Sequence, residues 1–268
     1  MFKRKINLIR INKSVREETL DTVLIEKVIE IFVNSEPLVN IVCLPKDLKE
    51  LTVGFLFSIG IINNIDDIKK IEINEMDNQI HIELHSSNDY KSKNLNTNPM
   101  SRVIDSTCGI PSPWRNIIKN SIDAAKSSKC EDNVKISSQI IFSSTKKMQS
   151  ESLLYKETGG CHSAAIFDFN GTMLDIKEDI GRHNAIDKVI GTLLSKRHDF
   201  NKVFLISTGR LTGDSVLKAI RAKIPIVASK SSAIESGIRL AFAYNITLIG
   251  FVRGTRMNIY TNSHRIIL

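Results

Sequence analysis

One of the four cysteines in this 268-residue chain, Cys108, has neighbours that favour thiol chemistry. The preceding segment, residues 86–101, is rich in Ser, Asn and Lys. It can bury too little apolar surface to offset its ordering entropy, so we expect a mobile arm. Gly109 frees the backbone beside the thiol, while Pro111 and Pro113 block a helix. The pattern indicates an exposed thiol, which becomes a reactive nucleophile when its pKa is lowered. A bystander cysteine in a loop is the alternative.

A second group of residues could bind phosphate. Four arginines stand in glycine-rich or charged loops where predicted strands end: Arg182, Arg210, Arg253 and Arg256. The guanidinium group is a rigid fork that matches phosphate oxygens in pairs. A surface salt bridge explains each arginine taken alone, but the four together favour a phosphate-rich ligand.

Two further combinations of residues resemble catalytic sites. Cys161 and His162 suggest the start of a zinc deaminase motif, which needs a glutamate two residues after the histidine and two later cysteines. Ala164 occupies the glutamate position and no cysteine follows Cys161, so we expect no metal site, a packed Cys161 and a hydrogen-bonded His162. His183 precedes Asp187 by one helical turn, which is compatible with a general base or with a histidine capping its own helix. The sequence has no serine-hydrolase elbow, P-loop or dinucleotide-binding glycine motif.

Composition narrows the class of protein. Hydrophobic residues make up 42% of the chain, and the formal net charge is +8. The charge favours an acidic partner or a phosphate-rich ligand, with a solvated basic surface as the alternative, and no nucleic-acid-binding motif occurs. The cysteines lack C-x-x-C spacing, which favours a reducing compartment. No secretory signal opens the chain, and its longest apolar stretch, residues 53–62, is about half a membrane span. We therefore expect a cytoplasmic protein without a membrane or nucleic-acid partner.

The first half of the chain predicts a small α+β domain ending near His85. Residues 1–22 are charged, and the start of this segment is expected to fray. The pattern then predicts two strands within 23–43 around a turn at 34–37, a helix from Asp47 to Gly60 with a capping box formed by Asp47 and Glu50, and a hairpin of strands 68–73 and 79–84.

The second half predicts a sheet covered by helices on both faces. Helices are expected at 114–127, 138–154, 183–195 and 212–222, and one more is capped by Ser232 with Glu235; strands are expected at 163–169, 172–177, 203–207, 226–229, 247–251 and 257–260. Such alternation builds an α/β domain whose ligands bind at the carboxyl ends of strands. We divide the chain into a small domain with its arm at 1–105, a loop and linker helix at 106–135, and an α/β domain at 136–268.

Ordered blocks of sequence carry a resemblance to a known family. From about Ser35 onwards they lie at residues 36–38, 53–62, 157–165, 178–188 and 252–260. These blocks resemble the formate dehydrogenase accessory sulfurtransferases, the FdhD family. The resemblance implies a cytidine-deaminase-like three-layer sandwich without zinc, joined to a smaller N-terminal α+β domain.

The resemblance also implies a function. Members of the family are sulfur carriers needed for formate dehydrogenase activity. They take persulfide sulfur from a cysteine desulfurase and pass it to the molybdenum bis(molybdopterin guanine dinucleotide) cofactor before the cofactor enters formate dehydrogenase. Cys108 matches the family's persulfide-carrying catalytic cysteine. The segment that contacts the cofactor matches Phe251, Val252, Arg253, Gly254, Thr255 and Arg256. Homodimers are common among such folds, so a homodimer is one arrangement to expect.

One position departs from the family pattern. Many members carry Cys-Gly-x-Cys in the loop, and this chain has Pro111 where the second cysteine would stand. A relay between two loop cysteines is therefore excluded. A persulfide forms on a single cysteine sulfur, however, so Cys108 can act as the carrier alone. The alternative is a chaperone that binds or inserts the cofactor without transferring sulfur.

Overall fold

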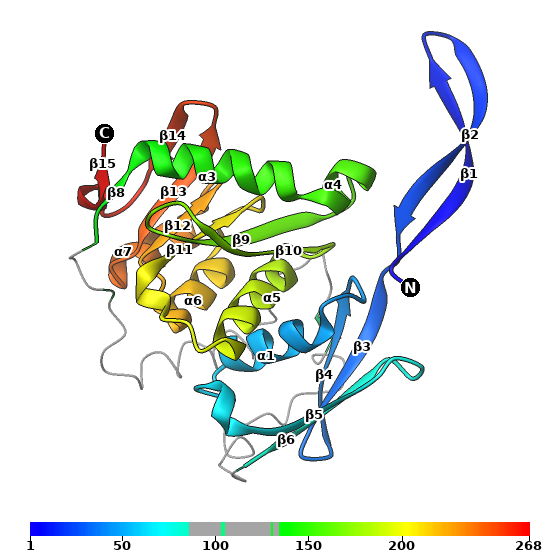
Figure 1. Cartoon of the computed structure of the whole chain (residues 1–268), viewed down its shortest axis with the longest axis horizontal. Coiled ribbons are helices and arrows are strands. Elements are labelled where there is room, and N and C mark those ends of the chain that lie inside the picture. Colours follow the sequence, from blue (N-terminus) through cyan, green and yellow to red (C-terminus); the bar gives the residue numbers. More distant parts are fainter. Residues whose placement is uncertain (86–102, 105–129, 131–133) are drawn as a thin grey trace.

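Two β-sheets, of six and five strands, organise the chain in the computed structural model, which describes residues 1–85, 103–104, 130 and 134–268 (Figure 1). Cys108, the expected arm at 86–101 and the expected helix at 114–127 lie outside the described residues.

The six-stranded sheet has the order β10-β9-β11-β12-β13-β14. Its strands are β9 (His162–Asp168), β10 (Met173–Asp179), β11 (Val203–Ser207), β12 (Ile226–Ser229), β13 (Thr247–Arg253) and β14 (Arg256–Ile259). The three central strands, β11, β12 and β13, run parallel, and the outer pairings are antiparallel. The hairpin of β9 and β10 turns at the expected Asn170–Gly171 pair, with Gly171 at a φ of 84°.

Helices cover both faces of this sheet, as the alternating pattern predicted (Figure 1). They are α3 (Ser138–Glu151), α4 (Leu153–Thr158), α5 (Arg182–Ser195), α6 (Gly213–Ala222) and α7 (Glu235–Ala243). Successive residues of β9 point to opposite faces. Phe167 packs in the core beneath α3, whereas Ile166 joins the core that contains Val189 of α5. The α/β class is confirmed, and the likeness to cytidine deaminases stays a prediction.

The five-stranded sheet has the order β5-β6-β3-β4-β7 and lies beyond helix α1 (Leu48–Ser58) (Figure 1). Its strands are β3 (Lys27–Val33), β4 (Glu36–Cys43), β5 (Ile68–Asn74), β6 (Gln79–Leu84) and β7 (Val103–Ile104). Shorter elements are η1 (Ile65–Asp67), η4 (Phe200–Lys202), η5 (Ser263–Arg265) and the parallel pair β8 (Ile136–Ser137) and β15 (Ile266–Ile267).

Helices α1 and α5 join the two halves of the molecule at close range. A Cβ atom on Gly54 would stand 1.8 Å from the Asp187 carbonyl oxygen, and one on Gly191 would stand 2.0 Å from the Glu50 carbonyl oxygen. Only glycine permits backbones to approach this closely. One hydrophobic core accordingly contains residues of both sheets. The domain boundaries at 105 and 135 stay predictions.

The expectation of a frayed N-terminal segment is wrong. Strands β1 (Lys3–Asn12) and β2 (Val15–Leu24) form a hairpin that projects from the body (Figure 1). Its two turn residues, Lys13 and Ser14, both have positive φ, which is typical of a tight hairpin turn. The sequence lacks the Asn-Gly signal of such a turn, so only the charge of the segment was used and the hairpin was not predicted.

Two predicted helix starts also need correction. Asp47 stands at the N-cap of α1, but its backbone is left-handed and its carboxylate makes no cap; it accepts a hydrogen bond from Lys177 Nζ at 3.2 Å. Helix α7 starts at Glu235 after Ile234, without a side-chain cap, so Ser232 does not cap it. The glycine stop is confirmed, because α1 ends at Ser58 and Gly60 is left-handed.

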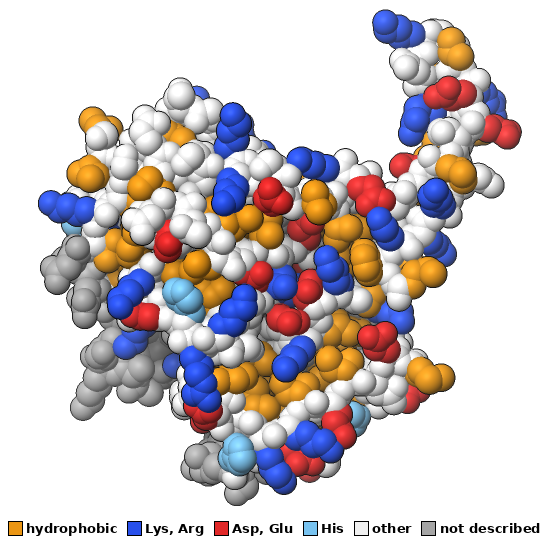
Figure 2. Space-filling view, viewed as in Figure 1, with side chains coloured by type: hydrophobic (Ala, Val, Ile, Leu, Met, Phe, Trp, Pro, Cys, Tyr) orange, Lys and Arg blue, Asp and Glu red, His pale blue; other side chains and the backbone are white. Residues whose placement is uncertain are grey.

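Charges of both signs are interspersed on the face of the molecule seen in Figure 2. Figure 2 shows Lys and Arg side chains spread across the visible face with Asp and Glu between them. This distribution favours a solvated surface over a broad basic patch on that face. Among the described residues, no helix combines the length and the apolar character needed to cross a bilayer.

Candidate functional site

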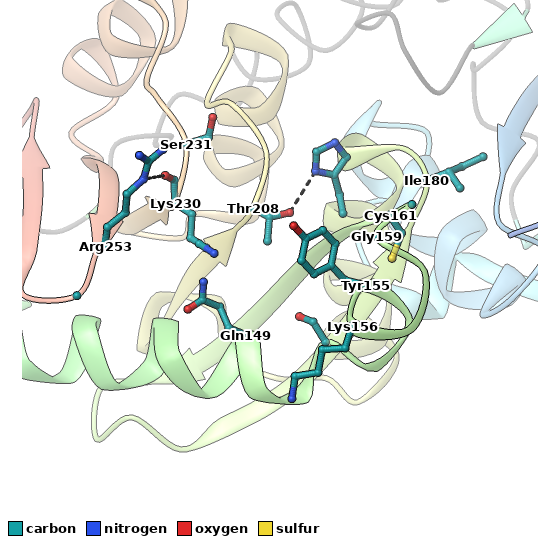
Figure 3. Close-up of a pocket in the computed structure, with 14 residues that line it drawn as sticks. Gln149, Tyr155, Lys156, Gly159, Cys161, Ile180, Thr208, Lys230, Ser231 and Arg253 are labelled. Carbon is teal, nitrogen blue, oxygen red and sulfur yellow. Dashed lines mark hydrogen bonds between the residues drawn. The ribbon is translucent and has the colours of Figure 1, made fainter. Parts of the chain in front are cut away.

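A cavity of about 830 Å³ opens at the edge of the six-stranded sheet where ligands were expected (Figure 3). Strands β11, β12 and β13 end at this edge, and the antiparallel β9 begins there. Fourteen residues line the cavity: Gln149, Ser152, Tyr155, Lys156, Gly159, Gly160, Cys161, His162, Ile180, Thr208, Lys230, Ser231, Arg253 and Gly254.

The charged side chains of this lining are basic. Lys156 comes from α4, Lys230 follows β12, and Arg253 ends β13; no Asp or Glu is among the lining residues in the described part of the chain. Arg253 is held in place, since its Nε donates to the Lys230 carbonyl at 3.2 Å and its guanidinium lies 5.4 Å from the centre of the Phe251 ring. A cluster of this kind attracts anions.

His162 is hydrogen-bonded, as the sequence predicted. Its Nδ1 lies 3.1 Å from Thr208 Oγ1, which also accepts from the Ser163 amide (Figure 3). Burial lowers the pKa of His162, and the nearby Arg182 and Arg210 lower it further. Two of the four predicted arginines thus act on this histidine electrostatically, and the neutral ring is favoured near pH 7.

Glu178, at the end of β10, holds one wall of the cavity. Its Oε2 accepts from the Leu154 amide at 2.9 Å, and its Oε1 accepts from the Tyr155 amide at 2.9 Å. The Cys161 thiol lies 3.6 Å from the same Oε1. The predicted helix 138–154 is interrupted at Ser152, and this carboxylate caps the short helix α4 that follows.

The described cysteines are poor nucleophiles. Burial raises the pKa of Cys130 to about 11 and, together with the Glu178 carboxylate, raises that of Cys161 to about 12. Burial also raises the pKa of Cys43, helped by Asp179. All three thiols therefore stay protonated near neutral pH.

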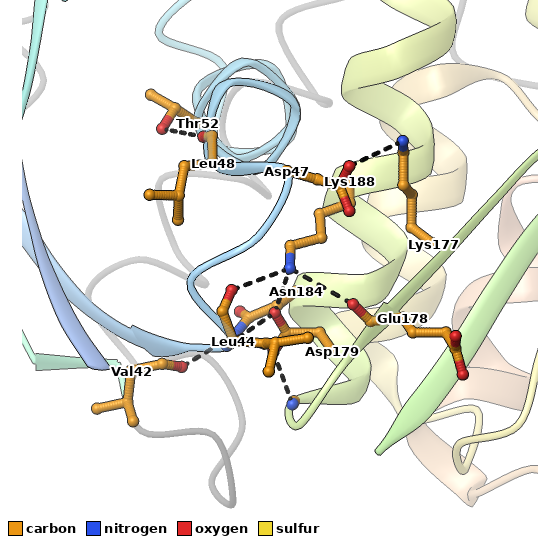
Figure 4. Close-up of polar contacts among 11 residues, drawn as sticks. Val42, Leu44, Asp47, Leu48, Thr52, Lys177, Glu178, Asp179, Asn184 and Lys188 are labelled. Carbon is orange, nitrogen blue, oxygen red and sulfur yellow. Dashed lines mark hydrogen bonds and ion pairs between the residues drawn. The ribbon is translucent and has the colours of Figure 1, made fainter. Parts of the chain in front are cut away.

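A buried ion pair anchors the end of β10 to the N-terminal half (Figure 4). Lys188 Nζ donates to Asp179 Oδ2 at 2.6 Å and to the Leu44 carbonyl at 3.2 Å. The Asp179 carboxylate also accepts from the amides of Leu44 and Gly181 and from Asn184 Nδ2, at 2.8 to 3.1 Å. The loop after β4 is thus tied to the strand end beside the cavity.

Asp187 serves two partners other than the histidine expected from helical spacing. Its carboxylate accepts from Lys218 Nζ at 2.6 and 2.7 Å and from Ser58 Oγ at 2.7 Å. It links α5 to α6 and α1, so the proposed orientation of His183 by this carboxylate is not its role. The described residues contain no cluster of three or more His, Cys, Asp or Glu side chains able to hold a metal.

The predicted cofactor-contacting segment lies at the turn between β13 and β14. Arg253 and Gly254 line the cavity. Val252 is buried in the core beneath α3, and Phe251 occupies a strand irregularity with a φ of 53°. Thr255 and Arg256 are exposed and are not among the lining residues in the portion described. Their binding roles stay predictions.

Sequence reasoning missed several lining side chains. Lys230 could have been found, because it directly follows a predicted strand, as Thr208 does. Tyr155 and Lys156 had no such signal, since they lie where a single helix was expected to end.

Comparison with known proteins identifies the family. The sequence matches the FdhD/NarQ family over residues 24–267. The chain belongs to the FdhD/NarQ family. The resemblance read from the sequence blocks is confirmed.

Relatives in the FdhD/NarQ family align over most of their length. The sulfur carrier protein FdhD of Sulfolobus acidocaldarius is 36% identical over 266 residues, 99% of each chain. That of Bacillus pumilus is 35% identical over 246 residues, 92% of this chain and 90% of the relative. The crystal structure of a proposed formate dehydrogenase accessory protein from Desulfotalea psychrophila superposes over 100% of both chains, with a TM-score of 0.79 and 27% identity.

Proposed function

We propose that this protein is a sulfur carrier in formate dehydrogenase maturation, with sulfurtransferase activity. Cys108 takes the outer sulfur of a cysteine desulfurase persulfide and passes it to the molybdenum bis(molybdopterin guanine dinucleotide) cofactor. The names of the relatives support this assignment, since they are called sulfur carrier proteins and the structural relative is described as a formate dehydrogenase accessory protein.

The observation that carries the proposal is the state of the other cysteines. Cys43, Cys130 and Cys161 are buried, and the pKa of each thiol is raised. Sulfur exchange needs a thiolate to attack the donor persulfide. Cys108 is the fourth cysteine of the sequence and the candidate that remains.

In the first transfer the Cys108 thiolate attacks the outer sulfur of the donor persulfide. A new S–S bond forms at Cys108, the donor's S–S bond breaks, and the donor cysteine leaves as a thiolate. No external oxidant or reductant is required for this exchange.

The lining of the cavity suits the binding of part of the cofactor. The cofactor is a polyanion with two pyrophosphates and two guanines, and the lining offers Lys156, Lys230 and Arg253 without an opposing carboxylate among the described residues. A volume of about 830 Å³ is in the range that takes a nucleotide-sized ligand. We assign the cavity to a guanine nucleotide arm of the cofactor.

A second candidate function is favoured by Pro111, which stands where many family members have a second loop cysteine. The protein would then bind or insert the cofactor as a chaperone without carrying sulfur. It would hold the cofactor in the same cavity.

Intact mass after incubation with a cysteine desulfurase and cysteine separates the two functions. The sulfur-carrier proposal predicts an adduct of one sulfur atom that reductant removes, that is absent from Cys108→Ala and that persists in the matched control Cys161→Ser. Absence of any adduct on the wild-type protein during desulfurase turnover would favour the chaperone.

A further inference from the structure

We infer that Glu178 is a positioning residue for the cavity: its carboxylate fixes helix α4, which carries Tyr155 and Lys156 to the cavity wall. The inference rests on the proposed function in one respect, because it takes the ligand of the cavity to be a guanine nucleotide. Glu178 itself is not among the lining residues of the described part of the chain, so it acts on the cavity through α4.

Helix α4 has little stability of its own. It contains six residues, and helices this short are marginal without help. The first amides of a helix need acceptors from outside it. Ser152 stands at the N-cap but provides no side-chain cap, because its hydroxyl donates backwards to the Met148 carbonyl at 2.7 Å.

Glu178 supplies the missing acceptors from a distant strand. Its two oxygens each accept one amide of the first turn of α4, from Leu154 and Tyr155, at 2.9 Å. A carboxylate at a helix N-terminus is stabilised by the helix dipole as well as by the hydrogen bonds. The side chain is 9% exposed, and its backbone carbonyl accepts from the buried Lys188 at 3.4 Å, so the strand end that presents it is anchored.

The helix held in this way makes much of the cavity. Six of the fourteen lining residues lie between Ser152 and Cys161. Figure 3 shows Gln149, Tyr155, Lys156 and Cys161 among the residues that line the cavity. Cys161 also lies within hydrogen-bonding range of Glu178, so one carboxylate orders both ends of the α4 segment.

The test begins with Glu178→Gln. Glutamine keeps the shape but turns one acceptor into a donor, which must face an amide that is also a donor. We expect the dissociation constant for guanosine diphosphate, measured by calorimetry, to rise about tenfold, in line with the loss of a helix cap. Glu157→Gln is the matched control: Glu157 lies on the same helix but pairs with Lys3 at the surface, and we expect unchanged binding.

A double-mutant cycle distinguishes positioning from general destabilisation. Lys156→Ala should weaken binding by a smaller factor in the Glu178→Gln background than in the wild type, because α4 no longer holds Lys156 at the wall. Lys230→Ala, from another wall, should cost the same factor in both backgrounds. Equal factors for Lys156→Ala in the two backgrounds would overturn the inference.

Hydrogen exchange of the α4 amides tests the role of Glu178 without depending on ligand binding. The amides of Leu154 and Tyr155 should exchange faster in Glu178→Gln and at the wild-type rate in Glu157→Gln. If wild-type protein bound no guanosine diphosphate, the assignment of the cavity would fail, and exchange would still decide the role of Glu178. Unchanged protection of both amides would overturn it.

Discussion

The Lys188 ammonium lies 2.6 Å from the Asp179 carboxylate, and neither side chain is exposed to solvent. The pair ties the end of β10, beside the cavity, to the loop after β4: the Leu44 amide donates to Asp179, and Lys188 donates to the Leu44 carbonyl. Glu178, the neighbour of Asp179, points the other way and caps α4. Two adjacent acids thus connect the N-terminal half of the chain with the cavity wall.

Removing one member of this pair should be costly. Lys188→Met leaves a buried carboxylate without its counter-charge, so we expect the free energy of unfolding to fall by about 3–5 kcal/mol. Urea denaturation measures the change. Lys202→Met, which removes an exposed partner of Asp199, is the control and should have little effect. Equal stability of the two variants would contradict a structural role for the buried pair.

The contact between α1 and α5 should not tolerate a methyl group. Gly54→Ala places a Cβ 1.8 Å from the Asp187 carbonyl oxygen, so the helices must separate. We expect the free energy of unfolding to fall by about 1–3 kcal/mol, the usual range for overpacking. Gly160→Ala is the control, because the nearest atom to its new Cβ is 3.6 Å away. A Gly54→Ala protein with a wild-type melting temperature would show that the helices are not in this contact.

Nucleotide binding should depend on Arg253 more than on Arg256. Arg253 lines the cavity, whereas Arg256, at the start of β14, is not among the lining residues of the described part of the chain. We expect Arg253→Ala to raise the dissociation constant for guanosine diphosphate about tenfold, the loss of one charge-assisted contact, and Arg256→Ala to change it less. Thermal stability should change little in either variant. If calorimetry showed a larger effect for Arg256→Ala than for Arg253→Ala, the ligand would bind at the turn between β13 and β14 and not in the cavity.

His162 should make stability depend on pH. Its pKa in the folded protein lies below the ordinary 6.5, chiefly through burial, so the unfolded chain binds the proton more readily. The stabilisation from the neutral ring is present above about pH 6.5 and is lost as the pH falls towards the folded pKa. Melting temperatures between about pH 5 and 7 should fall less steeply for His162→Asn than for the wild type. Parallel curves would exclude this contribution.

The four cysteines should differ in alkylation rate. Raised pKa values and burial protect Cys43, Cys130 and Cys161. Peptide mapping after brief iodoacetamide treatment at neutral pH should find Cys108 modified first. Faster labelling of Cys161 than of Cys108 would point to a different sulfur carrier.

Local sequence patterns predicted most of the large sheet. Strands with alternating residues, the Asn170–Gly171 turn and amphipathic helices all depend on residues that are close in sequence. The break at Ser152 could not be read this way. Helical spacing continues across it, and the acceptor that starts α4 is Glu178, more than twenty residues away. The hairpin of β1 and β2 was missed for a local reason, since Lys13 and Ser14 make its turn without a glycine.

The site was predicted in part for similar reasons. Arg253 was found because it ends a strand, and strand ends of one sheet meet at one edge. The partners of Asp187 were not found, because helical spacing pointed to His183 while Lys218 and Ser58 approach from other helices. Contacts between elements distant in sequence are what such patterns leave out.

We propose that sulfur is carried on Cys108. The decisive measurement is formate dehydrogenase activity in a host lacking this protein, complemented with the wild-type chain, Cys108→Ala or the control Cys130→Ser. We predict that the wild type and Cys130→Ser, which lies outside the cavity lining, restore activity and that Cys108→Ala, present at an equal level, does not. Full activity with Cys108→Ala would contradict the account and leave a protein that only binds the cofactor.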